Sequence, residues 1–229
     1  MRMVDVATSL GASIARMGAG LKASAPKKRP AKPLELYEFE ACPFCRKVRD
    51  AITELDLEAM IYPCPKNGKR FRSKAKKLGG KEQFPYLVDP NTGKAMYESD
   101  GIVRYLFETY GGRSASLLLT GPFATLSSQI ASVWRPIQGS RARASHAPKE
   151  PLELYSFEAS PFCRIVRETL CELELPYLLH NVGKKSPSRK AFVKRSGKMQ
   201  VPYLVDPNKG KAMFESADIK AYLLKTYGA

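Results

Sequence analysis

The sequence predicts an α/β protein built from two tandem copies of one unit, each a four-stranded mixed sheet flanked by helices. The first observation is a repeat, because three stretches of the chain recur at an offset of 118 or 117 residues: 34–46 at 152–164, 84–91 at 201–208, and 94–99 at 211–216. The second is the order of elements within each copy, which reads strand, helix, strand, helix, hairpin, helix. A βαβ unit followed by a ββα unit implies a mixed sheet with helices on both faces.

Each element of the first copy follows from a local pattern. The apolar run 34–39 predicts a strand, and the spacing of Val48, Ile52 and Leu55 predicts a helix that begins at Pro43. Next come a strand, a basic helix, a hairpin around a Pro- and Gly-containing turn, and a last helix, expected at 59–62, 71–78, 86–97 and 99–110. We expect Ser99 to cap the last helix, with an inward stripe of Ile102, Val103, Leu106 and Tyr110.

These patterns divide the chain into four segments. Residues 34–112 and 152–229 are the two repeated domains. Residues 1–33 are a basic segment and residues 113–151 a linker, and the Pro- and charge-rich stretches beside each domain are typical of linkers. A weak match between 7–16 and 124–135 suggests a lead-in helix before each domain, although both stretches are rich in Ala and Ser.

The net charge of +16 is concentrated outside the repeated domains, since ten of these charges lie in residues 1–33 and 113–151. Such a distribution attracts nucleic acid, anionic lipid or acidic proteins. No base-stacking motif of the RRM or OB kind is visible, so we expect no nucleic-acid partner and interpret the charge as solubilising.

Composition also bears on the compartment. Five cysteines in 229 residues are odd in number and too sparse for a disulfide scaffold, which indicates a reducing compartment. Residues 1–33 are rich in Ala, Ser, Arg and Lys, as in an organelle transit peptide, so cleavage or retention of this segment stays open. No stretch of about twenty apolar residues predicts a membrane span.

The strongest chemical signal is Cys42-Pro43-Phe44-Cys45 between the first strand and the first helix. Unpaired N–H groups and the positive end of the dipole face a sulfur at a helix N-terminus and favour its thiolate. Cys42 is therefore the candidate nucleophile, and Cys45 lies within reach to resolve a mixed disulfide formed there. A structural zinc site is the alternative, but His146 and His180 are distant in sequence, so we predict no metal.

The motif, with Phe84-Pro85 before the third strand and Glu98-Ser99 before the last helix, resembles the thioredoxin fold in its glutaredoxin and glutathione S-transferase N-terminal form. Both copies share the resemblance. The tandem arrangement resembles duplicated glutaredoxin-like proteins of plastids, which implies a chloroplast protein, with the cytoplasm as the alternative.

The resemblance implies a glutathione site in each copy. In this fold the proline before the third strand is cis, and the backbone before it pairs with the cysteinyl part of glutathione, which implies roles for Phe84, Pro85, Val201 and Pro202. The Glu-Ser pairs imply contacts with the γ-glutamyl end, at Glu98, Ser99, Glu215 and Ser216. A basic run from Lys66 to Lys77 is either a glycyl-carboxylate site or a solvated helix face, and Arg46 and Arg164 are expected to raise the positive potential near the thiolate.

The second copy has Ser160 in place of Cys42, so it lacks the dithiol. A serine hydroxyl there can still donate a hydrogen bond to a glutathione thiolate, as the resemblance to serine-type transferases implies. We expect Cys163 and Cys171 to be packed in the core, Cys64 to be an inert thiol with a redox role as the alternative, and His180 to be a surface imidazole.

The leading hypothesis is a glutathione-dependent thiol-disulfide oxidoreductase acting on disulfides or glutathionylated proteins, with Cys42 as nucleophile and the second copy as a degenerate glutathione-binding domain. One alternative is a non-enzymatic glutathione-binding or scaffold protein, and another is a transferase-like activity, although no full helical domain follows either copy. A third is carriage of a [2Fe-2S] cluster held by Cys42 thiolates of two chains and glutathione.

Overall fold

The computed structural model describes residues 3–133 and 135–229. The first copy contains β1 Leu34–Glu38, α2 Pro43–Glu54, β2 Ala59–Pro63, α3 Arg72–Gly79, β3 Tyr86–Asp89, β4 Lys94–Met96 and α4 Ser99–Leu106, which continues as the π-helix η1 Phe107–Gly111. The second contains β5 Leu152–Ser156, α6 Pro161–Glu172, β6 Tyr177–Asn181, α7 Arg189–Ser196, β7 Tyr203–Asp206, β8 Lys211–Met213 and α8 Ser216–Tyr227. Two more helices, α1 Met3–Ala15 and α5 Gly121–Val133, precede the copies.

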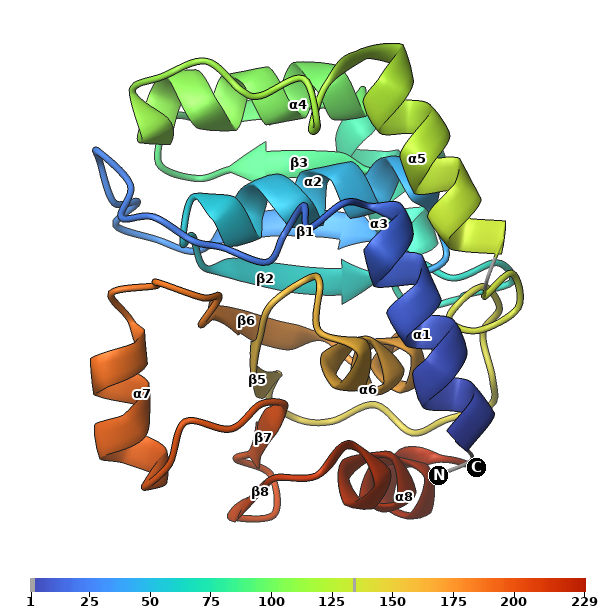
Figure 1. The fold of residues 1–229 in the computed structure, drawn as a ribbon. Coiled ribbons are helices and arrows are strands. Elements are labelled where there is room, and N and C mark those ends of the chain that lie inside the picture. The colour runs from blue at the N-terminus through green and yellow to red at the C-terminus, as the bar shows by residue number, and fades with distance from the viewer. Residues whose placement is uncertain (1–2, 134) are drawn as a thin grey trace.

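The two copies form one continuous sheet. Its eight strands run in the order β4-β3-β1-β2-β6-β5-β7-β8, so each copy contributes a four-stranded mixed sheet of the thioredoxin fold (Figure 1). Within a copy β1 and β2, or β5 and β6, are parallel, and the other pairs are antiparallel. The copies join where β2 pairs antiparallel with β6, with Met60 opposite Leu178. The edge strand of each isolated copy is thereby covered.

Side chains along each strand alternate between the two faces of the sheet, and a different set of helices covers each face. Leu34 and Leu36 of β1 point into the main core, which extends through both copies and is covered by α2, α4, α6 and α8. Tyr37 points to the other face, where α3 covers an aromatic cluster, and Tyr155 does the same beneath α7. The period of two therefore determines which face each helix covers.

The lead-in helices pack on the opposite copy. Helix α1, which precedes the first copy, packs on α6 of the second, and α5, which precedes the second copy, packs on α2 of the first. Ser9 Oγ donates a hydrogen bond to Pro161 O at 2.9 Å, and Ser128 Oγ donates to Pro43 O at 2.7 Å. Because each lead-in helix packs on the motif helix of the other copy, the chain has an internal two-fold arrangement.

A buried cluster of charges lies where the copies meet. Arg49 of α2 bonds Glu158 of the second copy (Nε to Oε2 3.0 Å), and Arg167 of α6 bonds Glu40 of the first (Nε to Oε2 3.1 Å). All four side chains are at most 2% exposed. Because Arg49 and Arg167 are repeat equivalents, as are Glu40 and Glu158, the two pairs are reciprocal.

Two glycines, one in the segment after each lead-in helix, lie against this buried cluster of charges. Gly20 has φ of +68°, and a Cβ there would lie 2.5 Å from Asp50 Oδ1 and 2.7 Å from Glu158 Cβ. Gly139 also has φ of +68°, and its Cβ would lie 2.8 Å from Glu40 Cβ. Both positions require glycine, because the backbone is left-handed and lies directly against a buried carboxylate side chain.

The reciprocal pairing predicts a large stability effect from one carboxylate. Replacing Glu158 by Gln keeps the shape of the side chain but removes a negative charge that Arg49 and Arg167 share in a buried site. We expect the free energy of unfolding to fall by about 3–5 kcal/mol. Urea unfolding measures this change.

The matched control is Glu54→Gln, in an ion pair with Arg113 whose side chains are 27% and 44% exposed. An exposed pair contributes little, so this change should stay within about 1 kcal/mol. Equal losses in the two variants would contradict the role assigned to the buried cluster.

Candidate functional site

Cys42 lies at the N-cap of α2, where the sequence predicted it. Its Sγ accepts a hydrogen bond from the backbone N of Cys45 at 3.2 Å, and Pro43 occupies the first turn without losing a hydrogen bond. The side chain is 4% exposed, whereas the neighbouring Phe44 is 42% exposed. The sulfur therefore lies just beneath the surface at an anion-stabilising helix terminus.

The two cysteines of the motif differ in acidity. Burial opposes ionisation of Cys42, but hydrogen bonds from the side chain and backbone of Cys45 outweigh it, so the pKa of the Cys42 thiol is lowered. Burial and the neighbouring Cys42 sulfur raise the pKa of Cys45 well above its usual value. Ionisation is therefore favoured at Cys42 over Cys45, whose thiol donates a hydrogen bond to Cys42.

A buried carboxyl group adjoins this pair. Glu38, at the end of β1, is 1% exposed and is held by Arg49. Burial raises the pKa of Glu38 to about 7, against the attraction of Arg49 and with repulsion from Glu40 and Glu158. Its charge opposes ionisation of Cys42, whereas Arg49 favours it. The second copy has Ser156 in this position, so the acid is specific to the copy with the dithiol.

The other residues of the predicted site lie on neighbouring strand ends. The β1–β3 register continues to Phe39 opposite Phe84, whose rings meet edge-on with centroids 6.3 Å apart. Met96, the last residue of β4, lies opposite Leu87, so Glu98 follows β4 at the end of the sheet where Pro85 leads into β3. Because Cys42 follows Phe39 by three residues, Phe84, Pro85, Glu98 and Ser99 share one edge of the sheet with it. The Phe84–Pro85 and Val201–Pro202 bonds are both cis, as the sequence predicted.

Glu98, not Ser99, is the N-cap of α4, which corrects the expected boundary. Glu98 has φ of +68° and is exposed, whereas Ser99 is the first helical residue and is 7% exposed. Gln83 Nε2 donates to Glu98 Oε1 at 2.6 Å. The same arrangement recurs in the second copy, where Gln200 donates to Glu215 and Ser216 begins α8.

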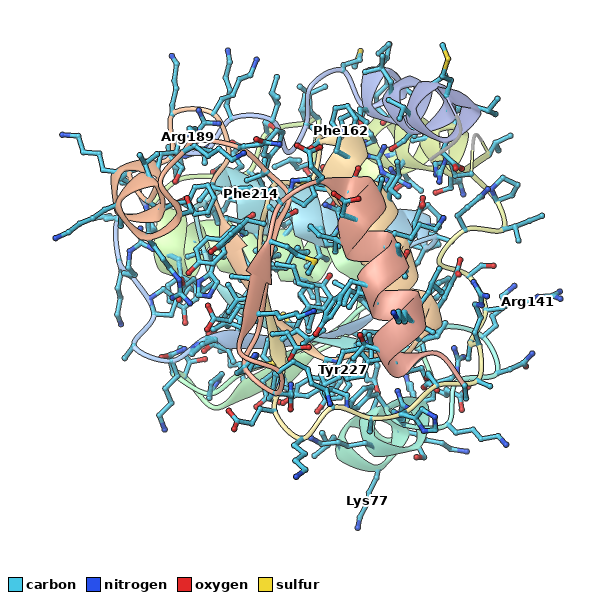
Figure 2. The ribbon with its side chains drawn as sticks, turned by 90° about the horizontal axis from the view of Figure 1, so that it is seen from below. Lys77, Arg141, Phe162, Arg189, Phe214 and Tyr227 are labelled. Atoms are coloured by element: carbon cyan, nitrogen blue, oxygen red, sulfur yellow. The ribbon has the colours of Figure 1, made fainter. Side chains whose placement is uncertain are left out.

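Two residues beside this edge were not singled out from the sequence. Arg72 places its guanidinium 4.8 Å from the centre of the Phe84 ring and donates to Cys64 O at 2.8 Å. Arg189 makes the equivalent bonds to Val182 O and Gly183 O. In Figure 2 Arg189 and Phe162 lie at one edge of the second copy, with Tyr227 towards the other end. Arg72 belongs to the basic run, but only the fold distinguishes it from the other cations there.

The second copy has the same arrangement at the start of its motif helix, with a serine in place of the Cys42 thiol. Ser160 is the N-cap of α6, and its Oγ accepts from the backbone N of Cys163 at 3.3 Å. Ser160 is 4% exposed and Cys163 is fully buried. The helix terminus therefore carries a hydroxyl in place of a thiol, and burial raises the pKa of Cys163 inside the helix.

The expectations for Arg46, Arg164 and His180 change in the structure, whereas Cys171 lies in the core as predicted. Arg46 and Arg164 are buried at the junction of the copies, and Arg49 is the cation that favours the Cys42 thiolate. Cys64 and Cys171 are both buried, and burial raises the pKa of each. His180 is only 16% exposed, because its ring stacks on Tyr155.

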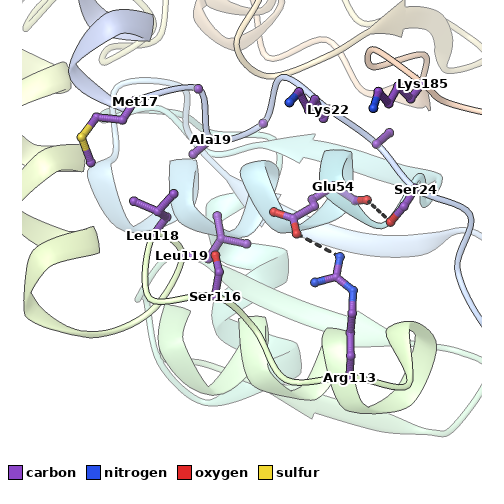
Figure 3. A pocket seen from close by; sticks show the side chains of 13 residues that line it. Met17, Ala19, Lys22, Ser24, Glu54, Arg113, Ser116, Leu118, Leu119 and Lys185 are labelled. Carbon is purple, nitrogen blue, oxygen red and sulfur yellow. Dashed lines mark hydrogen bonds and ion pairs between the residues drawn. The ribbon is translucent and has the colours of Figure 1, made fainter.

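The described residues contain a cavity, but no cluster of metal-binding side chains and no membrane-spanning helix. A cavity of about 440 Å³ is lined by Glu54, Arg113 and Leu119, with Lys22 and Lys185 at its rim (Figure 3). Glu54 ends α2 and Cys42 begins it, so this cavity is at the far end of the helix from the thiols. Within 3–133 and 135–229 no group of three or more His, Cys, Asp or Glu side chains is arranged to hold a metal ion, and no helix is long and apolar enough to cross a membrane.

Comparison with protein-family models gives a match in each copy. The model "Glutathione S-transferase, N-terminal domain" matches residues 36–114 and 154–229. The chain belongs to the glutathione S-transferase N-terminal domain family. Both matched segments contain a complete helix N-terminus, cis proline and Glu-Ser pair, so the match covers the degenerate copy as well as the one with the dithiol.

Two solved glutathione transferases show a remote similarity to this family member. One is BmGSTD1 of Bombyx mori, with 17% identity and a TM-score of 0.32, covering 64% of this chain and 81% of that one. The other is TDR1 of Leishmania, described as a trimeric glutathione transferase, with 14% identity and a TM-score of 0.31, covering 86% and 69%. No curated protein matches the chain.

The different acidities predict selective alkylation within the dithiol. Iodoacetamide should modify Cys42 first, with an apparent pKa below the roughly 8.5 of a free cysteine. Replacing Cys45 by Ala removes a hydrogen-bond donor to the thiolate, so the apparent pKa of Cys42 should rise. Peptide mass spectrometry across a pH series measures both values.

Cys163 is the internal control, because it occupies the place of Cys45 beside a serine and should react far more slowly than Cys42. Preferential labelling of Cys45 or Cys163 would contradict the assignment.

The raised pKa of Glu38 predicts a pH-dependent loss of stability. An acid with a folded pKa of about 7 and an ordinary value of 4.5 stabilises the fold most below pH 4.5, and this contribution is lost as the pH rises to about 7. Glu38→Gln keeps the neutral form at every pH, so its stability relative to the native chain should increase over that interval.

Urea unfolding of both chains between pH 4.5 and 8 measures this difference. Parallel stability profiles for the two chains would show that Glu38 does not titrate in this range.

Proposed function

We propose that the chain is a glutathione-dependent thiol-disulfide oxidoreductase whose chemistry occurs at Cys42 of the first copy. The observation that supports this proposal most strongly is the acidity difference within the dithiol, with a lowered pKa at Cys42 and a raised pKa at Cys45. A nucleophile must be ionised to attack, whereas a resolving thiol is best kept protonated until the mixed disulfide forms.

In the first step the Cys42 thiolate attacks the glutathionyl sulfur of a mixed disulfide. A bond forms between Cys42 Sγ and that sulfur while the substrate's disulfide bond breaks, and the substrate leaves as a thiolate that takes a proton from water. The substrate is reduced and Cys42 is oxidised to a glutathionyl disulfide. The attack requires a small opening at Cys42, since its side chain is 4% exposed.

Two routes complete the cycle. A second glutathione thiolate can attack the glutathionyl sulfur on Cys42, which releases oxidised glutathione and restores the Cys42 thiolate. Alternatively, Cys45 loses its proton and attacks Cys42 Sγ, which forms the Cys42–Cys45 disulfide and releases glutathione as a thiolate. Two further glutathione molecules then reduce that disulfide. The raised pKa of Cys45 favours the first route.

The residues around the thiol fit the ends of the tripeptide. The first turn of α4, with Ser99 and its N–H groups, suits the γ-glutamyl carboxylate, and Glu98 suits the γ-glutamyl ammonium. Arg72 lies beside Phe84 at the other side and suits the glycyl carboxylate. The backbone at Phe84 and Pro85 would align the cysteinyl part with Cys42.

The second copy is proposed to bind glutathione without disulfide exchange. It retains Gln200 with Glu215, the Val201–Pro202 cis bond and Arg189, and Ser160 replaces the nucleophile. The exposed Glu-Gln pairs and the buried sulfur also fit a protein that binds glutathione in both copies and catalyses nothing. Isothermal titration with glutathione distinguishes two sites from one, and turnover distinguishes enzyme from binding protein.

Two further points concern where the protein is located and whether it carries an iron-sulfur cluster. The tandem arrangement resembles that of plastid proteins, which supports a proposed chloroplast location that a fluorescent fusion tests. Carriage of a [2Fe-2S] cluster by Cys42 thiolates of two chains would need ligands from outside one chain. Visible absorbance after anaerobic purification tests that alternative.

Substitution of the two cysteines predicts different losses of turnover. Cys42→Ser should lower reduction of a small glutathione mixed disulfide at least a hundredfold (~10²), because a serine hydroxyl is not ionised near neutral pH. Cys45→Ser should keep substantial monothiol turnover, since glutathione completes the cycle. An assay coupled to glutathione reductase measures both.

Cys163→Ser is the matched control in the second copy and should leave turnover unchanged. Turnover that persists in Cys42→Ser would disprove the assigned nucleophile, and equal loss in both motif variants would require a strict dithiol cycle.

A further inference from the structure

One side of the molecule is formed by α1 and α5, which contact each other and lie side by side in Figure 1. Their outward side chains are large, apolar and at least 47% exposed. We name them the α1–α5 face, and its members are Met3, Val4, Leu10, Ile14, Met17, Phe123, Leu126, Ile130, Val133 and Ile137. The inward side chains are small, mostly Ser and Ala, and pack closely on α6 and α2.

The α1–α5 face is larger than the apolar patches of ordinary monomers. Ten side chains of this size, each about half or more exposed, present on the order of 1,000 Å² of apolar surface. The largest patch of a typical monomer is about 300–600 Å², and one side of a stable protein interface buries about 800 Å². The area is therefore sufficient for a stable interface.

The spacing of the exposed residues matches helix-on-helix packing. On α1 and the turn after it, the face residues 3, 10, 14 and 17, together with the exposed Ala7, follow alternating steps of four and three, and Val4 lies beside Met3. On α5 and the segment after it, positions 123, 126, 130, 133 and 137 alternate steps of three and four. This period of 3.5 produces the seam along which two helices interdigitate, so the partner of the face is expected to be helical.

The charge pattern does not favour a lipid surface. Helices that lie in a membrane interface carry Lys and Arg on a polar face that remains in water. Here Asp5 is the single charged residue of 3–15, and residues 114–134 contain none. The arginines that follow the two helices are buried in ion pairs, Arg16 with Asp50 and Arg135 with Glu168. They are therefore not available to contact lipid headgroups. The opposite sides of α1 and α5 pack on protein.

The internal two-fold arrangement gives α1 and α5 similar surroundings. Arg16 and Arg135 occupy equivalent places, as do Ser9 and Ser128, so α1 and α5 present similar stripes in a symmetrical arrangement. A second chain related by a two-fold axis offers the same pair of stripes. We propose that the α1–α5 face is the interface of a homodimer, in which α1 and α5 of two chains form a four-helix arrangement.

Sedimentation velocity of the full chain tests the proposal. The native protein should sediment as a dimer of a 25.5 kDa chain. Leu126→Glu places a charge in the middle of the face, where its side chain is 56% exposed in one chain. It should weaken association at least tenfold (~1.4 kcal/mol) without unfolding the chain.

The matched control is Leu78→Glu on α3, where the leucine is 53% exposed and lies outside the face, and this variant should stay dimeric. Ile14→Glu repeats the test on α1 if Leu126→Glu does not fold, as judged by circular dichroism. A native protein that is monomeric at about 100 μM would overturn the proposal, because an interface of this size should associate below that concentration. A Leu126→Glu protein that remains dimeric would overturn it too, as would a monomer that sediments with phosphatidylcholine vesicles.

Discussion

The structure depends on the reciprocal pairing of Arg49 with Glu158 and of Arg167 with Glu40. Each arginine comes from the motif helix of one copy and each partner glutamate follows the first strand of the other copy. Buried charges are costly unless each finds its partner, so only one relative placement of the copies satisfies all four. That placement brings β2 beside β6, completes the eight-stranded sheet, and lets each lead-in helix pack on the opposite copy.

The same cluster connects the junction of the copies to the candidate thiols. Glu38 and Arg49 belong to the cluster and influence the acidity of Cys42 in opposite directions. The second copy differs at two of these places, with Ser156 for Glu38 and Ser160 for Cys42, while its cis proline, Glu-Ser pair and arginine are retained. The two copies thus differ at the thiol and at the acid beside it, and share the residues around them. These differences are the basis of the proposed division of labour, with disulfide exchange in the first copy and glutathione binding in the second.

The sequence predicted the local elements because local patterns determine them. The Cys-Pro-Phe-Cys helix start and the hairpin turns depend on residues a few positions apart, and the apolar stripes of Val48 and Ile102 point inward as expected. The cis prolines were implied by the resemblance to the thioredoxin fold, not by a local pattern. The joining of the two sheets was not predicted. β2 and β6 pair through backbone hydrogen bonds, which leave no signal in the side chains, and each strand has the sequence of an ordinary edge strand. Arg49 and Glu158 look like surface charges in sequence, since their partners lie more than 100 residues away. Arg72 and Gln83 become site residues only once the fold places them beside Phe84 and Glu98.

The most direct test of this account is a trapping experiment on Cys45→Ser with oxidised glutathione. Without a resolving thiol, attack by Cys42 should leave one glutathionyl group on the protein, and peptide mass spectrometry should locate it at Cys42. We predict a single adduct in the first copy and none at Cys163, Cys171 or Cys64. An adduct on any of those cysteines in place of Cys42, or no adduct at all, would contradict the assignment of the chemistry to the first copy.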